Sequence, residues 1–516
     1  MNGAESLVRT LLAAQVDVCF TNPGTSEMHF VAALDQVPGM RCVLGLFEGV
    51  ATGAADGYAR MADKPAATLL HLGPGLANGL ANLHNARKAR SPIVNIVGEH
   101  AIAHRSYETP LASDLEGFAR PVSSWFRMSA DARSVAADAA AAVGAARTGA
   151  GRIATLALPA DTAWNEADGP AEPLPPPALT QVDVTAVAAA AAAIRSGKRV
   201  TLMLSGRALR EPCLTIAARI AAATGVRLLS QQSNARVQRG TGRVVVPRVP
   251  YPVDQALAAL GEIDVLLLAG ANLPIAFFAY PGKPSVLTPP DTEILRLASA
   301  DDDLEHALAW LADELGAAQT APLRNDALCM TAADPGVLTA ETVMQSVAAM
   351  LPEQAILCDE SVSSGRTLFR YTDGSAPHDY LQLTGGAIGG GLPMATGAAI
   401  ACPQRKVVSL EGDGAGMYTL QALWTQAREN LDIVTVVLAN RGYRILQGEL
   451  RNVGVTHPGE QAQRMLTVES PVLDWAGLAR AMGVEAARAD TTERFNDLLR
   501  TALSRRGPFL IEAQLA

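Results

Sequence analysis

Residues 406–440 read KVVSLEGDGAGMYTLQALWTQARENLDIVTVVLAN and contain the most specific pattern of the chain. An apolar run ends in Gly412, Asp413 and Gly414, a helical segment follows, and a second apolar run ends at Asn440. Alternating strands and helices are typical of a parallel sheet that is covered on both faces. The glycines allow a sharp turn beside an anionic group, and Asp413 with Asn440 could hold a hard cation such as Mg²⁺. A lone Gly-Asp-Gly is also compatible with a plain turn, so the prediction depends on the whole arrangement.

The same alternation continues through the rest of the chain. Short apolar runs between alanine-rich helical segments include VDVCF at 16–20, SPIVNIVGE at 91–99 and IDVLLLAG at 263–270. They predict an α/β fold of three domains with parallel sheets flanked by helices. Proline-rich residues 166–183 predict a linker, because proline fixes φ and lacks an amide donor, and a second irregular stretch spans 318–335. The domains are therefore expected at 1–165, 183–318 and 336–516.

Composition excludes several classes of protein. The 516 residues carry 51 acidic and 42 basic side chains, a formal charge of −9, whereas a nucleic-acid-binding surface is basic. Apolar residues make up 49%, enough for packed cores, so a disordered chain is excluded. No apolar run approaches the ~18 residues of a membrane span. The N-terminus lacks the basic start of a signal peptide, and residues 1–20 should form the first helix of the fold.

The cysteines are scattered over the chain without a CxxC pair or a cluster with histidine. They are Cys19, Cys42, Cys213, Cys329, Cys358 and Cys402. This usage fits a reducing compartment and excludes a structural zinc site. We therefore expect a soluble cytoplasmic protein with no nucleic-acid or membrane partner.

Two motifs in the first third carry further chemistry. Residues 21–27 are TNPGTSE, and residues 47–58 are FEGVATGAADGY. Glu48 lies between apolar stretches, which predicts a buried carboxyl group, and a buried carboxyl group needs a partner. The alternative is a solvated carboxylate at the start of a helix, the common fate of a glutamate.

Two segments of the last third are candidates for ligand binding. Residues 384–393 are TGGAIGGGLP, a glycine-rich run that alone could serve a dinucleotide fold or a tight loop. Ser363 lies in ESVSS at 360–364, where hydroxyls and helix-start amides could bind phosphate oxygens. A serine at a helix start is also often only a cap.

Together, the Gly-Asp-Gly segment with Asn440, the NPGTSE turn, the Glu48 segment and the glycine-rich run resemble thiamine diphosphate-dependent enzymes. The chain is most similar in outline to acetolactate synthase large subunits, with benzoylformate decarboxylase close behind. This resemblance implies a pyrimidine-binding first domain, a central dinucleotide-fold-like domain and a diphosphate-binding last domain. It also implies thiamine diphosphate and Mg²⁺ as cofactors. The cofactor would lie between two subunits, which makes a homodimer the minimum and a homotetramer the expected assembly.

The resemblance also implies roles for individual residues. Glu48 would share a proton with N1′ of the aminopyrimidine ring, which drives that ring to the imino form that removes the C2 proton. A carbonyl near Gly386 would accept from the pyrimidine amine, and Ile388 would hold the cofactor bent. His71 and Thr25 match positions where benzoylformate decarboxylase has an active-site histidine and a catalytic serine. The implied set is catalytic Glu48, His71 and Thr25; cofactor-binding Gly24, Ser363, Gly386, Ile388, Gly414 and Ala415; and metal-binding Asp413, Asn440 and Gly442.

Departures from these relatives bear on the reaction. Benzoylformate decarboxylase has a second active-site histidine where residues 273–280, LPIAFFAY, place Phe277 or Phe278. The tryptophan and the lysine found in acetolactate synthases have no counterpart in RGYRILQGELRN (441–452) or SSWFRMSAD (123–131). The central third carries no specific flavin signature, so FAD is not expected.

These observations predict thiamine diphosphate-dependent cleavage of a 2-oxo acid with carboligation to a second carbonyl compound. The alternative within the family is a non-oxidative 2-oxo acid decarboxylase of the benzoylformate decarboxylase type. A nicotinamide-dependent oxidoreductase, from another class, would need GxGxxG with an acidic residue about 20 positions later, which we do not find. A non-catalytic paralogue would lack the glutamate, and Glu48 is present.

Overall fold

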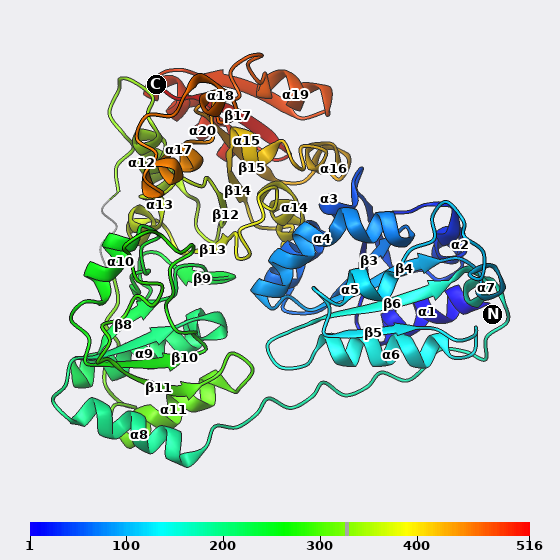
Figure 1. The fold of residues 1–516 in the computed structure, drawn as a ribbon, viewed down its shortest axis with the longest axis horizontal. Coiled ribbons are helices and arrows are strands. Elements are labelled where there is room, and N and C mark those ends of the chain that lie inside the picture. The colour runs from blue at the N-terminus through cyan, green and yellow to red at the C-terminus, as the bar shows by residue number, and fades with distance from the viewer. Residues whose placement is uncertain (326–329) are drawn as a thin grey trace.

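The computed structural model of the chain describes residues 1–325 and 330–516. Helices and strands alternate and form three separate sheets flanked by helices, as predicted (Figure 1). Cys329 lies outside the described residues, and the other cysteines are free thiols. Within the described ranges, no helix combines the length and the apolar character needed to cross a membrane.

The first sheet has six parallel strands in the order β2-β1-β3-β4-β6-β5. Its strands are β1 (Val18–Asn22), β2 (Arg41–Leu44), β3 (Ala66–Leu70), β4 (Ile93–Glu99), β5 (Trp125–Met128) and β6 (Ile153–Pro159). The helices around it are α1 (Gly3–Ala13), η1 (Thr25–Glu27), α2 (Met28–Gln36), α3 (Glu48–Ala62), α4 (Leu72–Ala89), η2 (Ile102–His104), α5 (Leu115–Ala119), α6 (Val135–Ala146) and α7 (Ala160–Trp164). Strands β3, β4 and β6 are buried along their whole length because helices cover both faces. Helix α1 confirms a helix at the N-terminus, but it ends at Ala13, and residues 18–20, which the prediction included in that helix, belong to strand β1.

An extended strap leads to the second sheet. Residues 166–183 contain no helix or strand, which confirms the predicted linker (Figure 1). The second sheet has four parallel strands in the order β11-β10-β7-β8. They are β7 (Val200–Leu204), β8 (Arg227–Ser230), β10 (Val265–Ala269) and β11 (Glu293–Ala298). The surrounding helices are α8 (Val184–Arg195), η3 (Gly206–Leu209), α9 (Glu211–Thr224), α10 (Val253–Leu260) and α11 (Leu304–Glu314).

The third sheet has seven strands in the order β16-β17-β15-β14-β12-β13-β9. Six of them are β12 (Ile356–Glu360), β13 (His378–Gln382), β14 (Val407–Gly412), β15 (Ile433–Ala439), β16 (Glu485–Ala489) and β17 (Phe509–Gln514). The helices are α12 (Ala340–Met350), α13 (Leu368–Tyr371), η4 (Thr372–Gly374), α14 (Gly391–Ala401), α15 (Asp413–Gly416), α16 (Ala422–Arg428), α17 (Arg444–Asn452), α18 (Glu460–Arg464), α19 (Trp475–Ala481) and α20 (Thr492–Ser504). Strands β14 and β15 are parallel, with Gly412 opposite Leu438. The residues that follow these strands therefore emerge at the same edge of the sheet.

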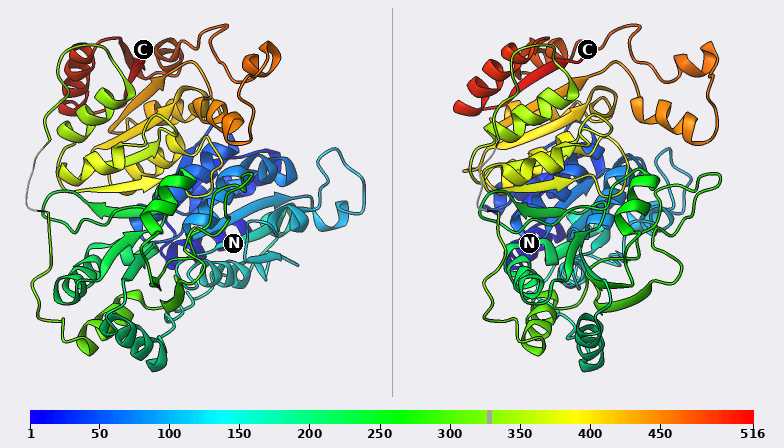
Figure 2. Two further views of the ribbon diagram at one scale, coloured as in Figure 1. Left: turned by 60° about the vertical axis from the view of Figure 1, so that its left-hand side comes forward. Right: turned by 90° about the vertical axis from the view of Figure 1, so that its left-hand side faces the viewer.

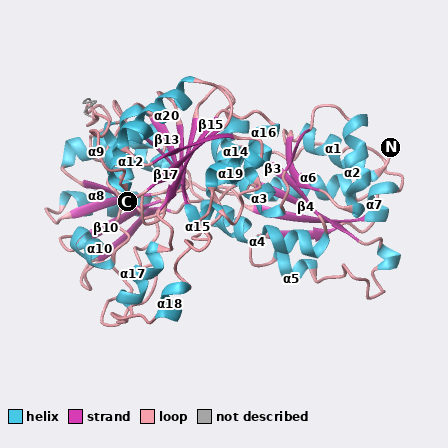
Figure 3. Ribbon diagram, turned by 90° about the horizontal axis from the view of Figure 1, so that it is seen from above, coloured by secondary structure: helices cyan, strands magenta, loops and turns pink. Residues whose placement is uncertain are grey.

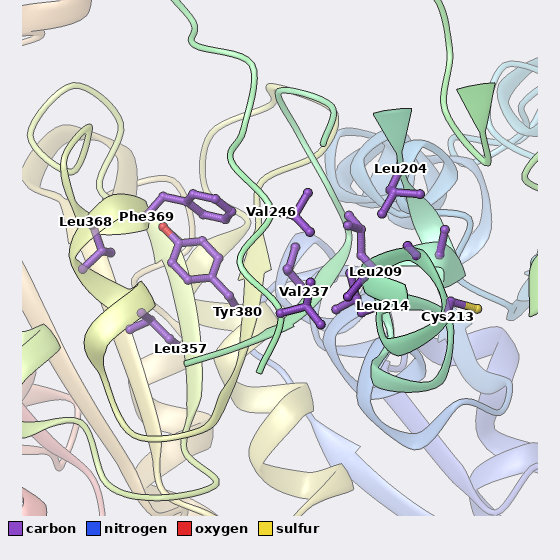
Figure 4. Packing of buried hydrophobic residues seen from close by; sticks show 14 of the residues in the cluster. Leu204, Leu209, Cys213, Leu214, Val237, Val246, Leu357, Leu368, Phe369 and Tyr380 are labelled. Atoms are coloured by element: carbon purple, nitrogen blue, oxygen red, sulfur yellow. The ribbon is translucent and has the colours of Figure 1, made fainter. Parts of the chain in front are cut away.

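The remaining strand of the third sheet comes from the central part of the chain and runs antiparallel. Strand β9 (Arg236–Arg239) pairs with β13 through Val237 opposite Tyr380. The prediction of parallel sheets missed this strand, because an edge position accepts either direction. Figure 4 shows Val237 and Val246 packed between Tyr380 and Leu204 of β7. One hydrophobic core therefore extends across the second and third sheets.

Helices α3 and α14 connect the first and third sheets (Figure 3). A Cβ at Gly57 would lie 2.0 Å from the carbonyl oxygen of Met394, and one at Gly397 would lie 1.8 Å from that of Ala54. Only glycine permits such a close approach of the two backbones. The contact anchors two helices whose N-termini adjoin predicted site segments.

Candidate active site

Asp413 lies at the edge of the third sheet, directly after β14. It is buried, and its carboxylate accepts hydrogen bonds from the backbone N–H of Gly414 at 2.8 Å and of Arg441 at 2.6 Å. Burial raises the pKa of Asp413, and the backbone hydrogen bonds oppose this shift. Its hydrogen-bond donors are thus neutral groups, and a bound cation would stabilise the ionised carboxylate.

Asn440 is brought beside this edge by the pairing of β14 with β15. Its Oδ1 accepts from the N–H of Gly442 at 3.0 Å, and its Nδ2 donates to the hydroxyl of Ser364 at 3.1 Å. Arg441 between them has φ 59°, a left-handed turn that carries the chain away from the sheet. The structure thus gathers the three predicted metal-binding residues at one sheet edge.

The Gly-Asp-Gly turn is packed against two aromatic residues. A Cβ at Gly414 would lie 2.6 Å from the ring of Tyr443, so a side chain there would displace that ring. The indole N–H of Trp475 donates to the carbonyl oxygen of Asp413 at 3.2 Å. Ala415 is buried in the same turn. Aromatic packing therefore holds the backbone that carries Asp413.

A cavity of about 590 Å³ opens beside the predicted glycine-rich segment. Gly386 and Ile388 both line it, and so do Phe277, Phe278 and Tyr251 from the central part of the chain. A Cβ at Gly386 would lie 2.8 Å from the ring of Phe277, so Phe277 packs directly on the glycine-rich segment. Helix α17, which projects with α18 from the third sheet (Figure 2), contributes to the cavity wall.

Ser363 lies in a turn that follows β12, and α13 begins only at Leu368. The expected helix start at this serine is therefore not observed. Its neighbour Ser364 contacts Asn440, and Val362, at φ 50°, lines the cavity. The segment predicted to bind diphosphate is thus at the same sheet edge as Asp413.

Glu48 begins α3 and is 8% exposed, which agrees with the burial predicted from its apolar surroundings. The amide Nδ2 of Asn78 in α4 donates to its Oε2 at 2.9 Å. A Cβ at Gly75 would lie 3.2 Å from its Oε1, so a glycine faces the second oxygen. Sequence reasoning missed Asn78, because its proximity to Glu48 depends on how α3 and α4 pack.

His71 precedes α4 and is held by residues of the NPGTSE turn. Its Nδ1 lies 2.9 Å from Oε2 of Glu27 and 3.3 Å from the hydroxyl of Ser26. Glu27 is buried and also accepts hydrogen bonds from the N–H of Gly24 at 2.7 Å and from Ser26 at 2.6 Å. A Cβ at Gly24 would lie 2.2 Å from the imidazole, so only glycine fits beside this ring. Thr25 is exposed, and the hydroxyl that contacts His71 belongs to Ser26.

Glu27 was not among the predicted site residues. Its signal in the sequence is a glutamate three residues after Gly24, the spacing of a capping box, and in the structure its carboxylate accepts the backbone N–H of Gly24, the one half of that box that a glycine allows. The predicted site residues form two groups within this chain, one beside the first sheet and one at the edge of the third sheet. The lining of the cavity beside Gly386 includes none of Glu48, His71 and Thr25.

Two protein-family models match the chain. The N-terminal TPP-binding domain of thiamine pyrophosphate enzymes matches residues 1–118, and the C-terminal TPP-binding domain matches residues 362–513. The chain belongs to the thiamine pyrophosphate enzyme family. Thiamine pyrophosphate is the same compound as thiamine diphosphate, so the family resemblance is confirmed. Membership in this family excludes the alternative of a nicotinamide-dependent oxidoreductase.

Relatives in the family carry two kinds of name. IlvX of Mycobacterium tuberculosis, assigned provisionally as an acetolactate synthase large subunit, is 50% identical over 514 residues, 99% of this chain and 98% of that protein. Benzoylformate decarboxylase of Pseudomonas aeruginosa is 28% identical over 96% of this chain and 95% of that protein. The large subunit of acetolactate synthase isozyme 1 of Escherichia coli is 24% identical over 99% of this chain and 94% of that protein.

Solved structures share the fold over the whole chain. The thiamine diphosphate-dependent 4-hydroxybenzoylformate decarboxylase of Rhodococcus jostii RHA1 superimposes with a TM-score of 0.88 at 23% identity, covering 100% of this chain and 99% of that one. A protein of Mycobacterium smegmatis, assigned provisionally as a thiamin diphosphate-dependent enzyme, gives a TM-score of 0.86 at 24% identity, with 100% of both chains covered. The three-sheet architecture is thus that of thiamine diphosphate-dependent enzymes.

The residues at the sheet edge fit a cation with diphosphate. Asp413 supplies a buried carboxylate, and Asn440 supplies an amide oxygen. No group of three His, Cys, Asp or Glu side chains within the described part of the chain could enclose a metal ion. A site with one carboxylate and neutral oxygens leaves positions for phosphate oxygens, the arrangement that Mg²⁺ commonly takes.

Proposed function

We propose that the protein uses thiamine diphosphate to cleave a 2-oxo acid and joins the remaining fragment to a second carbonyl compound. Its 50% identity to IlvX, over almost the full length of both chains, supports an acetolactate synthase-like function. When bound, thiamine diphosphate supplies a nucleophilic carbon for the ketone and an electron sink for loss of carbon dioxide.

Glu48 is the proposed acid that holds a proton at N1′ of the aminopyrimidine ring. Its burial supports this role, because a buried carboxyl group is shielded from water and needs a hydrogen-bond partner. Asn78 fixes one oxygen at 2.9 Å, and glycine faces the other. The free oxygen is then available to the ring nitrogen.

His71 is the proposed group that moves protons at the substrate oxygen. Glu27 accepts from Nδ1–H, which leaves Nε2 as the nitrogen free to exchange a proton. Thr25, exposed at the same turn, remains a candidate contact to the substrate.

Asp413, Asn440 and the backbone of Gly442 are the proposed Mg²⁺ ligands. Gly24, Ser363, Gly386, Ile388, Gly414 and Ala415 are the proposed cofactor contacts. The clustering of the metal-binding residues at one sheet edge supports this assignment.

The observation that carries carboligation is the packing of Phe277 on Gly386. Phenylalanine cannot donate a proton, so the side chain that packs on Gly386 supplies none to the fragment left after decarboxylation. Burial raises the pKa of Tyr251 and of Tyr443 in the same cavity, so these phenols are poor acids as well. The fragment would therefore persist until a second carbonyl compound reaches it.

The alternative function is a benzoylformate decarboxylase-type reaction that releases an aldehyde. The 28% identity to that enzyme of P. aeruginosa and the aromatic walls of the cavity favour it. The purified protein, loaded with thiamine diphosphate and Mg²⁺, should be given pyruvate alone, pyruvate with an aldehyde, and benzoylformate. A 2-hydroxy ketone as the main product supports carboligation, whereas free aldehyde as the main product supports the alternative.

The assembly is proposed to be a cytoplasmic homodimer or homotetramer. The separation of Glu48 and His71 from the cavity beside Gly386 supports a site completed by a second subunit. The free thiols of the described cysteines fit a reducing compartment. Light scattering of the purified protein tests the assembly, and a monomer that retains full activity would contradict it.

A further inference from the structure

Glu360, at the end of β12, is a buried carboxyl group that the proposed reaction does not use. It is 2% exposed and belongs to the wall of the cavity beside Gly386. Its Oε1 accepts from the N–H of Gly389 at 2.6 Å, and its Oε2 accepts from the N–H of Gly391 at 2.5 Å. One carboxylate thus satisfies two backbone donors of the glycine-rich segment.

A second buried acid stands beside Glu360. Glu411 lies directly opposite it on β14, and its Oε1 accepts from the hydroxyl of Ser409 at 2.7 Å, whereas its buried Oε2 has no hydrogen-bond partner among the described residues. Both oxygens of Glu360 accept N–H donors of the turn, whereas the hydrogen bond of Glu411 is to Ser409 of its own strand. Burial raises the pKa of both carboxyl groups, and the backbone N–H donors of the turn oppose this shift at Glu360. A Cβ at Gly391 would lie 2.3 Å from Oε1 of Glu411, so glycine is required between the pair and the turn.

The glycine-rich segment depends on such outside contacts for its shape. Gly386 and Gly389 have φ values of 78° and 91°. Glycine adopts positive and negative φ about equally readily, so its own conformational preference does not select these values. Asn82 and the hydroxyl of Thr419 donate to the carbonyl oxygen of Gly389 at 3.2 and 2.8 Å. These contacts bind the carbonyl side of the turn, whereas Glu360 binds its N–H side.

We propose that Glu360 is a positioning residue for the cofactor: it fixes the turn 389–391 and thereby holds the carbonyl at Gly386 and the side chain of Ile388 in place. The inference rests on the proposed function and deepens its cofactor site. Two hydrogen bonds to one buried carboxylate restrict the turn to one geometry. If these bonds were lost, two buried N–H groups would have no partner.

The test compares Glu360→Gln with Glu411→Gln. The amide nitrogen of glutamine at 360 would face one backbone N–H, so at least one hydrogen bond is lost. Glutamine at 411 has nearly the shape of glutamate and leaves both oxygens of Glu360 on the turn, so the turn stays bound. We expect Glu360→Gln to weaken thiamine diphosphate binding by about tenfold or more in calorimetric titration, and Glu411→Gln to bind within about threefold of wild type. Glu353→Gln changes an exposed glutamate on the same part of the chain and serves as the control.

A second measurement does not need the cofactor. Amide hydrogen–deuterium exchange of the peptide that contains residues 385–391 should be faster in the Glu360→Gln apoprotein, with exchange of the first sheet unchanged. If that variant does not fold, Glu360→Asp keeps the charge but reaches fewer donors, and it should show the same effects at smaller size.

The outcomes separate the two proposals. Wild-type binding and wild-type exchange in both position-360 variants would overturn the positioning role. Absence of thiamine diphosphate binding by the wild-type protein would instead overturn the proposed function, and the exchange result on the apoprotein would still decide whether Glu360 holds the turn.

Discussion

The carboxylate of Glu27 lies 2.9 Å from Nδ1 of His71, and the same carboxylate accepts the N–H of Gly24 and the hydroxyl of Ser26. Glu27 is buried, so this ion-pair-like contact is shielded from water. The imidazole is thereby fixed from two sides, by the carboxylate and by the backbone of Gly24. The NPGTSE turn therefore holds the imidazole of His71 in place.

Glu27→Gln should lower kcat by about 10- to 100-fold, because a neutral amide oxygen accepts the Nδ1–H of His71 more weakly than a carboxylate and so orients Nε2 less firmly. The affinity for thiamine diphosphate should stay within about threefold of wild type. Steady-state kinetics and calorimetric titration measure the two quantities. Asp35→Asn, on the exposed side of α2, is the control, and a normal kcat in Glu27→Gln would contradict the role of the contact.

Glu48→Gln should abolish turnover while the cofactor still binds. Glutamine fills the same space beside Asn78, but its amide cannot share a proton with N1′ as a carboxyl group does. Exchange of the cofactor C2 proton, followed by NMR after acid quench, should be slowed by several orders of magnitude. Exchange at the wild-type rate would show that another group activates the cofactor.

Asp413→Ala and Asn440→Ala should each weaken the retention of Mg²⁺ and thiamine diphosphate. Removal of a direct ligand should exceed the 10- to 100-fold loss that is typical of outer contacts, so we expect a loss above about 100-fold for Asp413→Ala. Calorimetric titration at fixed Mg²⁺ measures it. Asn452→Ala on α17 is the control, and unchanged affinity in both ligand variants would place the metal elsewhere.

Phe277→His should shift the products toward free aldehyde, because it places a proton donor against Gly386. Phe278→His is the matched control, since Phe278 lines the cavity while Phe277 makes the contact with Gly386. Gas chromatography of the products from pyruvate gives the ratio of aldehyde to 2-hydroxy ketone. The hypothesis fails if both variants change the ratio equally.

His378 makes the free energy of unfolding depend on pH. Burial first, and then the charge of Arg239, lower the pKa of His378 from its usual 6.5 to about 3. Below pH 6.5 this histidine therefore binds a proton in the unfolded chain but not in the folded chain. Its contribution to the free energy of unfolding is complete above pH 6.5 and is lost as the pH falls toward 3. The slope from this residue approaches ~1.4 kcal/mol per pH unit. Urea titrations between pH 7 and pH 5 should show a flatter decline for His378→Gln than for wild type or for the exposed-site control His457→Gln.

Local sequence patterns determined the class of the fold and the identity of most candidate residues. The run ending in Gly-Asp-Gly and the run ending at Asn440 are consecutive strands, and parallel pairing of such strands places their ends together whatever surrounds them. Burial of Glu48 followed from its apolar neighbours for the same reason: apolar side chains on both sides carry the residue into the core. These features depend on the order of residues within one or two elements.

The contacts between segments far apart in the chain depend on how whole elements pack in three dimensions. The pairing of β9 with β13, the hydrogen bond from Asn78 to Glu48, and the choice of Phe277 as the neighbour of Gly386 join residues that no local pattern connects. Glu360 is the extreme case: its two partners lie about 30 positions later, beyond a whole helix and strand. Such contacts are selected by the packing of complete elements, whose energy depends on volume and hydrogen-bond geometry in three dimensions and not on sequence spacing.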